Sequence, residues 1–266
     1  LAVLLTFTLI SAMPPVTVQA AVDDVFTDSS SELTFKVLTE DTNSGTVQVI
    51  QGSYSGANYT IPETVSDHGI SYTVIGIGYE AFSNCSGLGS ITLPDSLAYI
   101  GNLAFQGCTG LTSVNIPESV TEIGVSAFAG SGLTSVTIPA GVATVYDYAF
   151  NGCADLISIT FLQTTPPTIN GHVFTGTGLK TVIVPKGTAA QYGIKLSGKL
   201  PAGAAIVEAV ATITGVTVSP AAIEVEKGGT VSFTATVNGS GSFSPDVLWS
   251  VNSSSGSYIG QTDGVL

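Results

Sequence analysis

The 266-residue sequence predicts a mainly β protein, in which a solenoid of stacked repeats follows a β-meander cap and precedes an incomplete β-sandwich. Two strings recur with a period of about 23 residues, which falls in the range of solenoid repeats. Short segments near both ends alternate apolar and polar residues, as half-buried strands do. The 31 glycines and 12 prolines, with many β-branched and hydroxyl residues, are typical of short strands joined by tight turns.

Residues 1–20 have the features of a partial signal peptide: an apolar run, a break at Pro14-Pro15 and small residues near Ala20. A transmembrane anchor is the alternative, but the prolines interrupt the run well short of the ~20 apolar residues that a membrane span needs. No basic region or initiating Met precedes the run, so we expect the sequence to begin inside a longer reading frame. The mature protein is expected to start near Ala21 and to act outside the cytoplasm.

Residues 21–69 are expected to form the N-terminal cap. Three pieces between residues 33 and 65 alternate apolar and polar side chains, which predicts a β-meander covering the first repeat.

The repeats follow over residues 70–200, together with a C-terminal cap. One string ends in Ala-Phe or a close variant, and its phenylalanines lie 23, 23, 22 and 24 residues apart, at positions 82, 105, 128, 150 and 174. The other string is a short alternating strand, of which 111–116 is one copy, with Val114 and Ile116 facing inward and Pro117 ending it. A second extended piece, 119–123, follows it. One unit cannot bury these apolar faces alone, so we expect about five units to stack.

The complete pattern is Cys-x-x-Leu-x-x-(Ile/Val)-x-(Ile/Leu)-Pro-x-x-(Val/Leu)-x-x-Ile-Gly-x-x-Ala-Phe. It resembles the BspA-like, or Treponema-type, leucine-rich repeat of bacterial surface proteins and covers about residues 70–185. The resemblance implies a leucine-rich-repeat solenoid and a role in adhesion or recognition, with host matrix proteins or neighbouring cells as partners.

The C-terminal third is expected to contain three parts. Residues 187–195 suit a short capping helix with Thr188 as its N-cap. Residues 201–212 are rich in small residues and are predicted to be a linker. Residues 213–266 resemble a bacterial Ig-like (group 2) domain with Trp249 in its core, but they are too short for a complete sandwich, so we expect the domain to continue beyond residue 266.

The charge balance excludes some partners. Six Lys and Arg residues stand against 19 Asp and Glu, which argues against nucleic acid and against an anionic membrane surface, since both require clustered cations. After the N-terminal run, no segment is apolar enough for membrane insertion of the mature chain.

No catalytic or metal-binding constellation emerges. Cys85, Cys108 and Cys153 occupy one position of the repeat and are expected to pack in the core, with a Cys85–Cys108 disulfide as the alternative. They lack the paired spacing of a zinc site. His68 and His172 belong to different turns and are expected to be exposed.

The carboxylates form no motif either. Those of the repeat turns, which we expect to form a solvated rim, leave weak calcium binding open: Asp95, Glu118 and Glu122. We therefore expect no cofactor, no metal and no catalytic residue.

The outward positions of the repeat strands remain as a candidate surface. They predict two ladders of mostly short polar side chains, formed by Ser90 and Thr92, Ser113 and Asn115, Ser135 and Thr137, Ser158 and Thr160, and Thr181 and Ile183. These residues either keep a β face soluble or line an extended recognition surface. Few aromatic or arginine side chains accompany them, so binding at each position should be weak.

The sequence therefore predicts a non-enzymatic, monomeric protein, secreted or displayed on a bacterial cell surface, that binds extracellular proteins or glycans. One alternative is the accessory region of a larger secreted hydrolase whose catalytic domain lies outside this sequence. Another is a structural stalk without a ligand.

Overall fold

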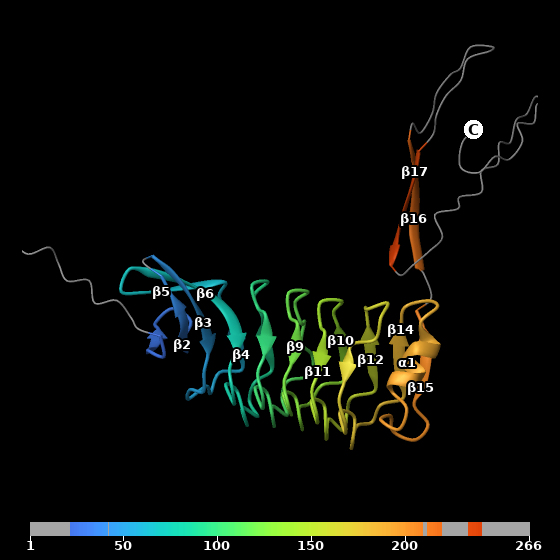
Figure 1. Cartoon of the computed structure of the whole chain (residues 1–266), viewed down its shortest axis with the longest axis horizontal. Helices are drawn as coiled ribbons and strands as arrows, with labels where there is room; N and C mark the ends of the chain where they lie inside the picture. The colour runs from blue at the N-terminus through green and yellow to red at the C-terminus, as the bar shows by residue number, and fades with distance from the viewer. Residues whose placement is uncertain (1–21, 42, 210–211, 220–233, 241–266) are drawn as a thin grey trace, which may run out of the picture.

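The computed structural model describes residues 22–41, 43–209, 212–219 and 234–240. Figure 1 shows its main feature, a row of stacked turns that begins at a small N-terminal sheet and ends at a short helix. The predicted signal peptide, residues 1–20, lies outside the described residues. Within the described ranges, no helix is both long and apolar enough to cross a membrane.

The N-terminal cap begins with an antiparallel meander of β1 (Val25–Asp28), β2 (Leu33–Glu40) and β3 (Ser44–Val49). Leu33, Phe35 and Val37 of β2 are fully buried, as the alternating sequence pattern predicts. The third expected piece, residues 58–65, does not extend this meander. Strand β3 instead pairs in parallel with β6 (Ile70–Ile77), and β4 (Asn58–Thr60), from the third piece, pairs with a strand of the solenoid.

The first sheet of the solenoid, here named the continuous sheet, runs in parallel from β6 to β13 without a gap. Its later strands have only two residues each: β8 (Tyr99–Ile100), β9 (Glu122–Ile123), β11 (Thr144–Val145) and β13 (Thr168–Ile169). Each two-residue strand places one β-branched side chain in the interior, and these side chains pair in register: Ile100, Ile123, Val145 and Ile169. Strand β5 (Thr64–Asp67) pairs antiparallel with β6 at the cap.

The second sheet, here named the ladder sheet, contains the other strand of each turn. It has two blocks. One is the parallel pair of β4 and β7 (Ser90–Thr92). The other contains four parallel strands: β10 (Ser135–Ile138), β12 (Ser158–Phe161), β14 (Thr181–Val184) and β15 (Ala205–Glu208). The segment 111–117 between the blocks is not a strand, so the prediction of a strand over 111–116 is wrong.

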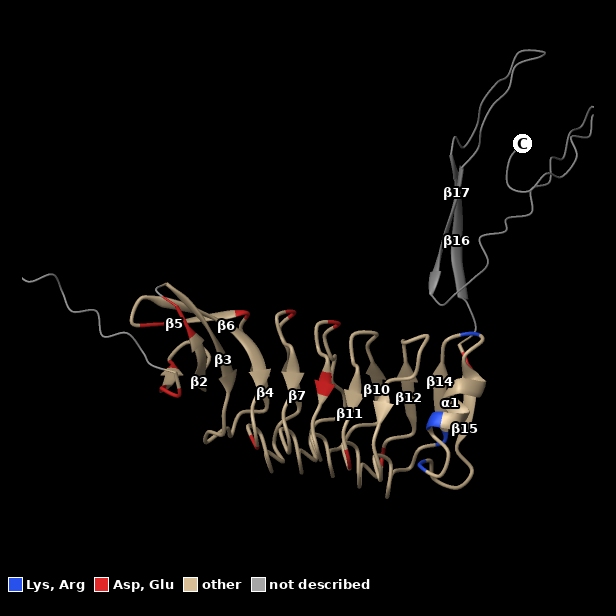
Figure 2. Cartoon of the chain, viewed as in Figure 1, with Lys and Arg blue, Asp and Glu red and all other residues tan. Residues whose placement is uncertain are grey.

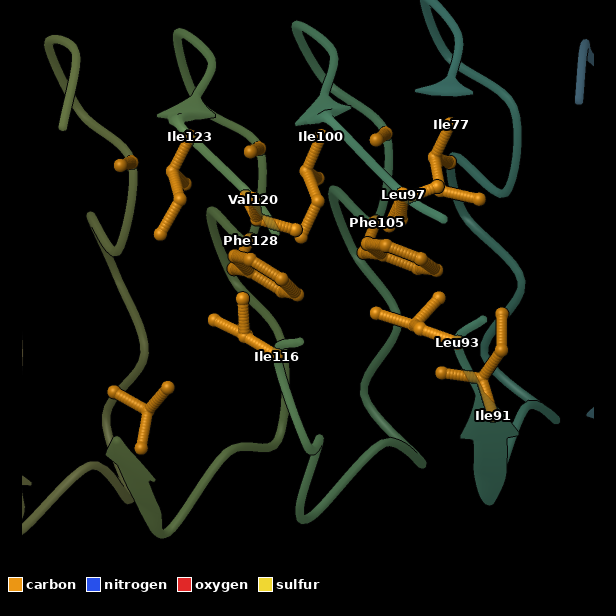
Figure 3. Packing of buried hydrophobic residues seen from close by; sticks show 14 of the residues in the cluster. Ile77, Ile91, Leu93, Leu97, Ile100, Phe105, Ile116, Val120, Ile123 and Phe128 are labelled. Atoms are coloured by element: carbon orange, nitrogen blue, oxygen red, sulfur yellow. The ribbon is translucent and has the colours of Figure 1, made fainter. Parts of the chain in front are cut away.

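Equivalent side chains from successive turns stack in columns between the two sheets, as Figure 3 shows for Phe105 and Phe128 and for Ile77, Ile100 and Ile123. The phenylalanine rings are nearly parallel, with centroids 5.2 Å apart between Phe105 and Phe128 and 5.5 Å apart between Phe128 and Phe150. A stacked pair of this kind adds about 0.5–1.5 kcal/mol beyond the burial of its area. The aromatic column is therefore a main source of contact between turns.

The turn before each phenylalanine uses left-handed backbone geometry. Five non-glycine residues at the same repeat position have φ between 53° and 60°: Glu80, Leu103, Ser126, Tyr148 and His172. Such a conformation is uncommon outside glycine. Its recurrence shows that stacking of the turns imposes one backbone path on different side chains.

The C-terminal cap contains the predicted helix, α1 (Ala189–Lys195). Thr188 is its N-cap, but the Thr188 hydroxyl donates to the carbonyl of Pro185 at 2.7 Å and does not cap the helix. Tyr192 is fully buried, and its ring contacts Phe161. Within the segment 201–212, predicted as a linker, β15 pairs in parallel with β14.

The solenoid therefore has about seven turns instead of the expected five. The additional turns come from β4 at the start and β15 at the end.

Two strands are described in the region predicted to be Ig-like. They are β16 (Thr212–Ser219) and β17 (Thr234–Ser240), and they pair antiparallel. Trp249, the predicted core residue of a sandwich, lies outside the described residues.

Candidate binding surface

The ladder sheet presents the predicted polar side chains in register wherever its strands pair. Ser135 stands opposite Ser158, which stands opposite Thr181, and Thr137 stands opposite Thr160. Ser90 and Thr92 occupy the same positions in β7. The structure therefore brings together the predicted residues of β10, β12 and β14, while those of β7 belong to the separate first block.

Exposure changes along these columns. The outward residues of β7 and β10 are exposed, whereas Ser158, Thr160 and Thr181 are half-buried. The most accessible part of the surface consequently lies near the centre and the N-terminal half of the solenoid.

Ser113 and Asn115 are exposed, but they lie in the gap of the ladder sheet. Val114 is only half-buried, whereas Ile91 and Val136, at the same position of the neighbouring turns, are buried. Val114 was predicted to face inward, so this prediction holds only in part.

The residue column that contains Asn115 suggests a physical reason for the gap. Its other members are β-branched: Thr60, Thr92, Thr137, Thr160, Ile183 and Val207. Asparagine is depleted in strands, because its short amide side chain competes for backbone hydrogen bonds. Asn115 is therefore the residue least suited to extend the ladder through this turn.

A groove of about 390 Å³ opens at this gap. Its floor and walls come from three successive turns and from Leu162 of the next, and its lining residues are Asp95, Asn115, Ile116, Pro117, Glu118, Ser119, Thr137, Pro139 and Leu162. It contains two residues of the predicted ladder, Asn115 and Thr137.

The groove combines negative charge with apolar surface. The carboxylates of Asp95 and Glu118 are exposed and form no hydrogen bond or ion pair with any described residue. Leu162 is 45% exposed and adds apolar surface to the groove. The backbone of Asp95 is held in place, because the Glu63 carboxylate accepts hydrogen bonds from the N–H groups of Asp95 and Ser96 at 2.7 and 3.1 Å.

The pKa of the Glu63 carboxyl is lowered, chiefly by a hydrogen bond with the Ser96 side chain and then by the backbone N–H of Asp95.

The sequence analysis missed two further rungs of the ladder, where a rung is the segment that one turn places in the ladder sheet. Asn58 and Thr60 of β4 stand opposite Ser90 and Thr92, and the Ser90 hydroxyl donates to Asn58 Oδ1 at 2.6 Å. The string at 58–62, Asn-Tyr-Thr-Ile-Pro, matches the strand string of the repeats and could have revealed this rung. At the other end, Val207 of β15 extends the ladder, but its segment lacks the proline that marks most repeat strands.

The cysteines are free thiols packed between turns. Cys108 and Cys153 are fully buried, as predicted. Each donates its S–H to the carbonyl of the phenylalanine in the preceding turn: Cys108 to Phe82 at 3.1 Å and Cys153 to Phe128 at 3.0 Å. Burial raises the pKa of Cys108 to about 12 and also raises that of Cys153. Cys85 in the first repeat is half-buried.

The histidines are exposed, as predicted. His68 Nδ1 lies 2.7 Å from a carboxylate oxygen of Asp67, and His172 stacks on the Tyr148 ring. In the described part of the chain, no three His, Cys, Asp or Glu residues are grouped so that they could hold a metal ion. Glu122, the third predicted rim carboxylate, is exposed on β9.

Charge is unevenly distributed along the solenoid. Figure 2 marks acidic residues over the N-terminal cap and the turns, whereas most of the described basic residues lie at the C-terminal end of the solenoid: Lys180, Lys186, Lys195 and Lys199. Lys36 of β2 lies in the N-terminal cap and pairs with Asp23 at 2.8 Å. Two of the acidic residues, Asp95 and Glu118, line the groove.

Comparison with protein families supports the repeat assignment. Residues 75–192 match the family described as BspA type leucine rich repeat region. They contain six copies of that repeat. The resemblance seen in the sequence strings is thereby confirmed for this segment, while no comparison supports the Ig-like resemblance of residues 213–266. No curated protein matches the chain significantly.

Several solved structures are similar to the chain. A leucine-rich repeat protein from Bacteroides ovatus is 25% identical, with a TM-score of 0.37, and the alignment covers 57% of this chain and 58% of that one. A leucine-rich repeat protein from T. pallidum is 20% identical, with a TM-score of 0.46 and coverage of 67% and 99%. A leucine rich cell surface protein from Faecalibacterium prausnitzii is 26% identical, with a TM-score of 0.45 and coverage of 70% and 50%.

Proposed function

We propose that this chain is a non-enzymatic recognition protein, secreted or displayed on a bacterial cell surface, that binds an extracellular protein through the ladder sheet. The groove at the gap carries this proposal, because it is a hollow in the middle of an otherwise regular face. The family match and the apolar N-terminal run support an extracellular location. Solenoids commonly use such extended faces to bind large partners.

The chemistry of the groove indicates which part of a partner would bind there. Asp95 and Glu118 supply two carboxylates that have no partner among the described residues, and Leu162 supplies an exposed apolar side chain that lines the groove with Pro117 and Pro139. A protein segment that carries a Lys or Arg next to an apolar side chain would satisfy both features. Exposed charge pairs contribute about 1 kcal/mol or less each, so the affinity at the groove should be modest.

The test is a binding screen of the full chain against immobilised extracellular-matrix proteins, mucins and glycans, at low and high salt. We expect saturable binding to a protein that weakens as salt rises, since exposed charge pairs are screened. The double variant Asp95→Asn, Glu118→Gln should weaken it about three- to tenfold.

The matched control is Asp155→Asn, which removes an exposed carboxylate in a different turn and should leave binding unchanged. Absence of saturable binding to every protein in the screen, or equal effects of the control and the double variant, would contradict the proposal.

A further inference from the structure

A second pocket, of about 500 Å³, lies in the N-terminal cap and is separate from the groove. It is formed by the turn between β1 and β2, the loop before β4, and β4 itself. Seven of its ten lining residues carry a hydroxyl group, and none is basic. Its volume falls within the ~300–1,000 Å³ that is usual for small-molecule sites.

Many hydrogen-bonding groups of this pocket have no partner within the described structure. Ser53, Ser55 and Thr60 form no side-chain hydrogen bond, and neither does the Glu32 carboxylate. The pocket therefore offers hydroxyls that both donate and accept, together with one acidic acceptor.

Two further side chains add free donors. Asn58 uses its Oδ1 to accept from Ser90, and its amide N–H groups have no acceptor in the described part of the chain. The Tyr59 hydroxyl accepts from the Gly56 N–H at 3.0 Å, while its own proton has no acceptor among the described residues. These donors lie among the hydroxyls of the same pocket.

The aromatic base of the pocket is rigid. Tyr59 is half-buried and meets Tyr54 edge-on, with ring centroids 5.6 Å apart, and both rings contact Phe82, the first ring of the aromatic column. Tyr54 is itself fixed, since its hydroxyl donates to the Ile50 carbonyl and accepts from the Thr34 N–H. A fixed ring with free polar groups around it suits a ligand that has both an apolar face and many hydroxyls.

We propose that this pocket binds a neutral saccharide. A sugar ring presents C–H groups that can pack on Tyr59, and its hydroxyls can pair with the free donors and acceptors around it. Glu32 can accept from two neighbouring sugar hydroxyls. The absence of a lysine from the lining residues disfavours acidic sugars and phosphate. This site goes beyond the proposed function, because it involves neither the groove nor its partner.

The experiment uses the full chain and neutral hexose and N-acetylhexosamine mono- and disaccharides at millimolar concentration, with binding followed by ligand-observed NMR and calorimetry. We expect saturable binding of at least one of them. Glu32→Gln should weaken it by about tenfold or more, because charged hydrogen bonds are lost, and Tyr59→Phe, which keeps the ring, by about two- to tenfold.

Ser66→Ala, which removes an exposed hydroxyl from β5, is the matched control and should have no effect, and neither should Asp95→Asn with Glu118→Gln. A circular-dichroism melt of each variant checks that the fold is intact. Failure of all the neutral sugars to bind, or binding that survives both pocket variants, would overturn this proposal, and neither result bears on the groove.

Discussion

The two sheets of the solenoid enclose the same interior but differ in continuity. The continuous sheet passes from β6 to β13 without a gap, although every strand after β6 has only two residues, whereas the ladder sheet has strands of three or four residues and still stops between β7 and β10. Strand length therefore does not decide whether the segment of one turn pairs with the segments of its neighbours. The inward column of the continuous sheet is β-branched throughout, and the interrupted rung contains the one asparagine of its column, Asn115.

The gap and the groove occur at the same turn. Where the ladder closes, its outward residues lie on a regular surface, and where it is open, Asn115 lines a hollow with Asp95 and Glu118. The comparison indicates that a local loss of sheet pairing creates the candidate binding site.

The largest expected effect concerns two cysteines, one before the unpaired segment of the ladder sheet (an open rung) and one before a paired strand (a closed rung). Cys108 precedes the open rung and Cys153 precedes the closed strand β12, yet both are fully buried. With its pKa raised to about 12, Cys108 should have a thiolate fraction at pH 8 about a thousandfold below that of the unfolded chain. Thiol labelling followed by mass spectrometry should find both residues equally slow, with Cys85 faster.

Rapid labelling of Cys108 alone would mean that the gap admits solvent to the interior.

The raised pKa of Cys108 also has a consequence for stability. Because folding raises this pKa, the contribution of the neutral thiol is complete below the unfolded pKa of about 8.5 and is lost as the pH rises towards 12.

The aromatic column is common to both sheets, so its removal should weaken both. Phe105→Ala and Phe128→Ala each delete a fully buried ring and should lower the free energy of unfolding by about 3–5 kcal/mol in denaturant titrations. Tyr79→Ala, at a residue that is 62% exposed, should change it by less than about 0.5 kcal/mol. Equal losses for the buried and exposed rings would be incompatible with this packing.

A pair of valines tests the difference between the sheets directly. Val145 of β11 is buried in the continuous sheet, and Val145→Ala should cost about 2–3 kcal/mol. Val114 is half-buried in the gap, and Val114→Ala should cost about 1 kcal/mol. If urea titrations gave the two variants the same loss, the open rung would be as well packed as the closed ones.

The smallest effect should come from closing the gap. Asn115→Thr restores the β-branched column and should raise the free energy of unfolding by about 0.5–1 kcal/mol. Hydrogen exchange should show new protection of the amides at residues 113–116, and the proposed groove should bind its protein partner more weakly. Unchanged exchange would mean that another residue holds the rung open.

The sequence predicted the stacked columns of side chains in the solenoid, but it did not predict the groove or the pocket on its surface. Leucine, isoleucine and phenylalanine strings with a fixed period specify a stacked interior, so the buried positions and the outward Ser and Thr positions could be assigned from sequence. The first rung escaped because its strand string at 58–62 is not preceded by an Ala-Phe string.

The groove could not be predicted, because it depends on residues from several turns. Asp95 and Leu162 are 67 positions apart in the chain and meet only when the turns are stacked. The pocket of the cap similarly joins Glu32 with Asn58, and no local string connects the two.

The open rung also affects how the solenoid should carry load. Turns of a solenoid contact only their neighbours, so a pull applied at the two ends passes through every junction in series. The junctions around residues 113–116 have one sheet to resist that pull, whereas the junctions between β10, β12 and β14 have two. Under tension, the solenoid is expected to extend first at these junctions, while the segments on either side stay stiff. The more extensible junctions lie at the candidate binding groove.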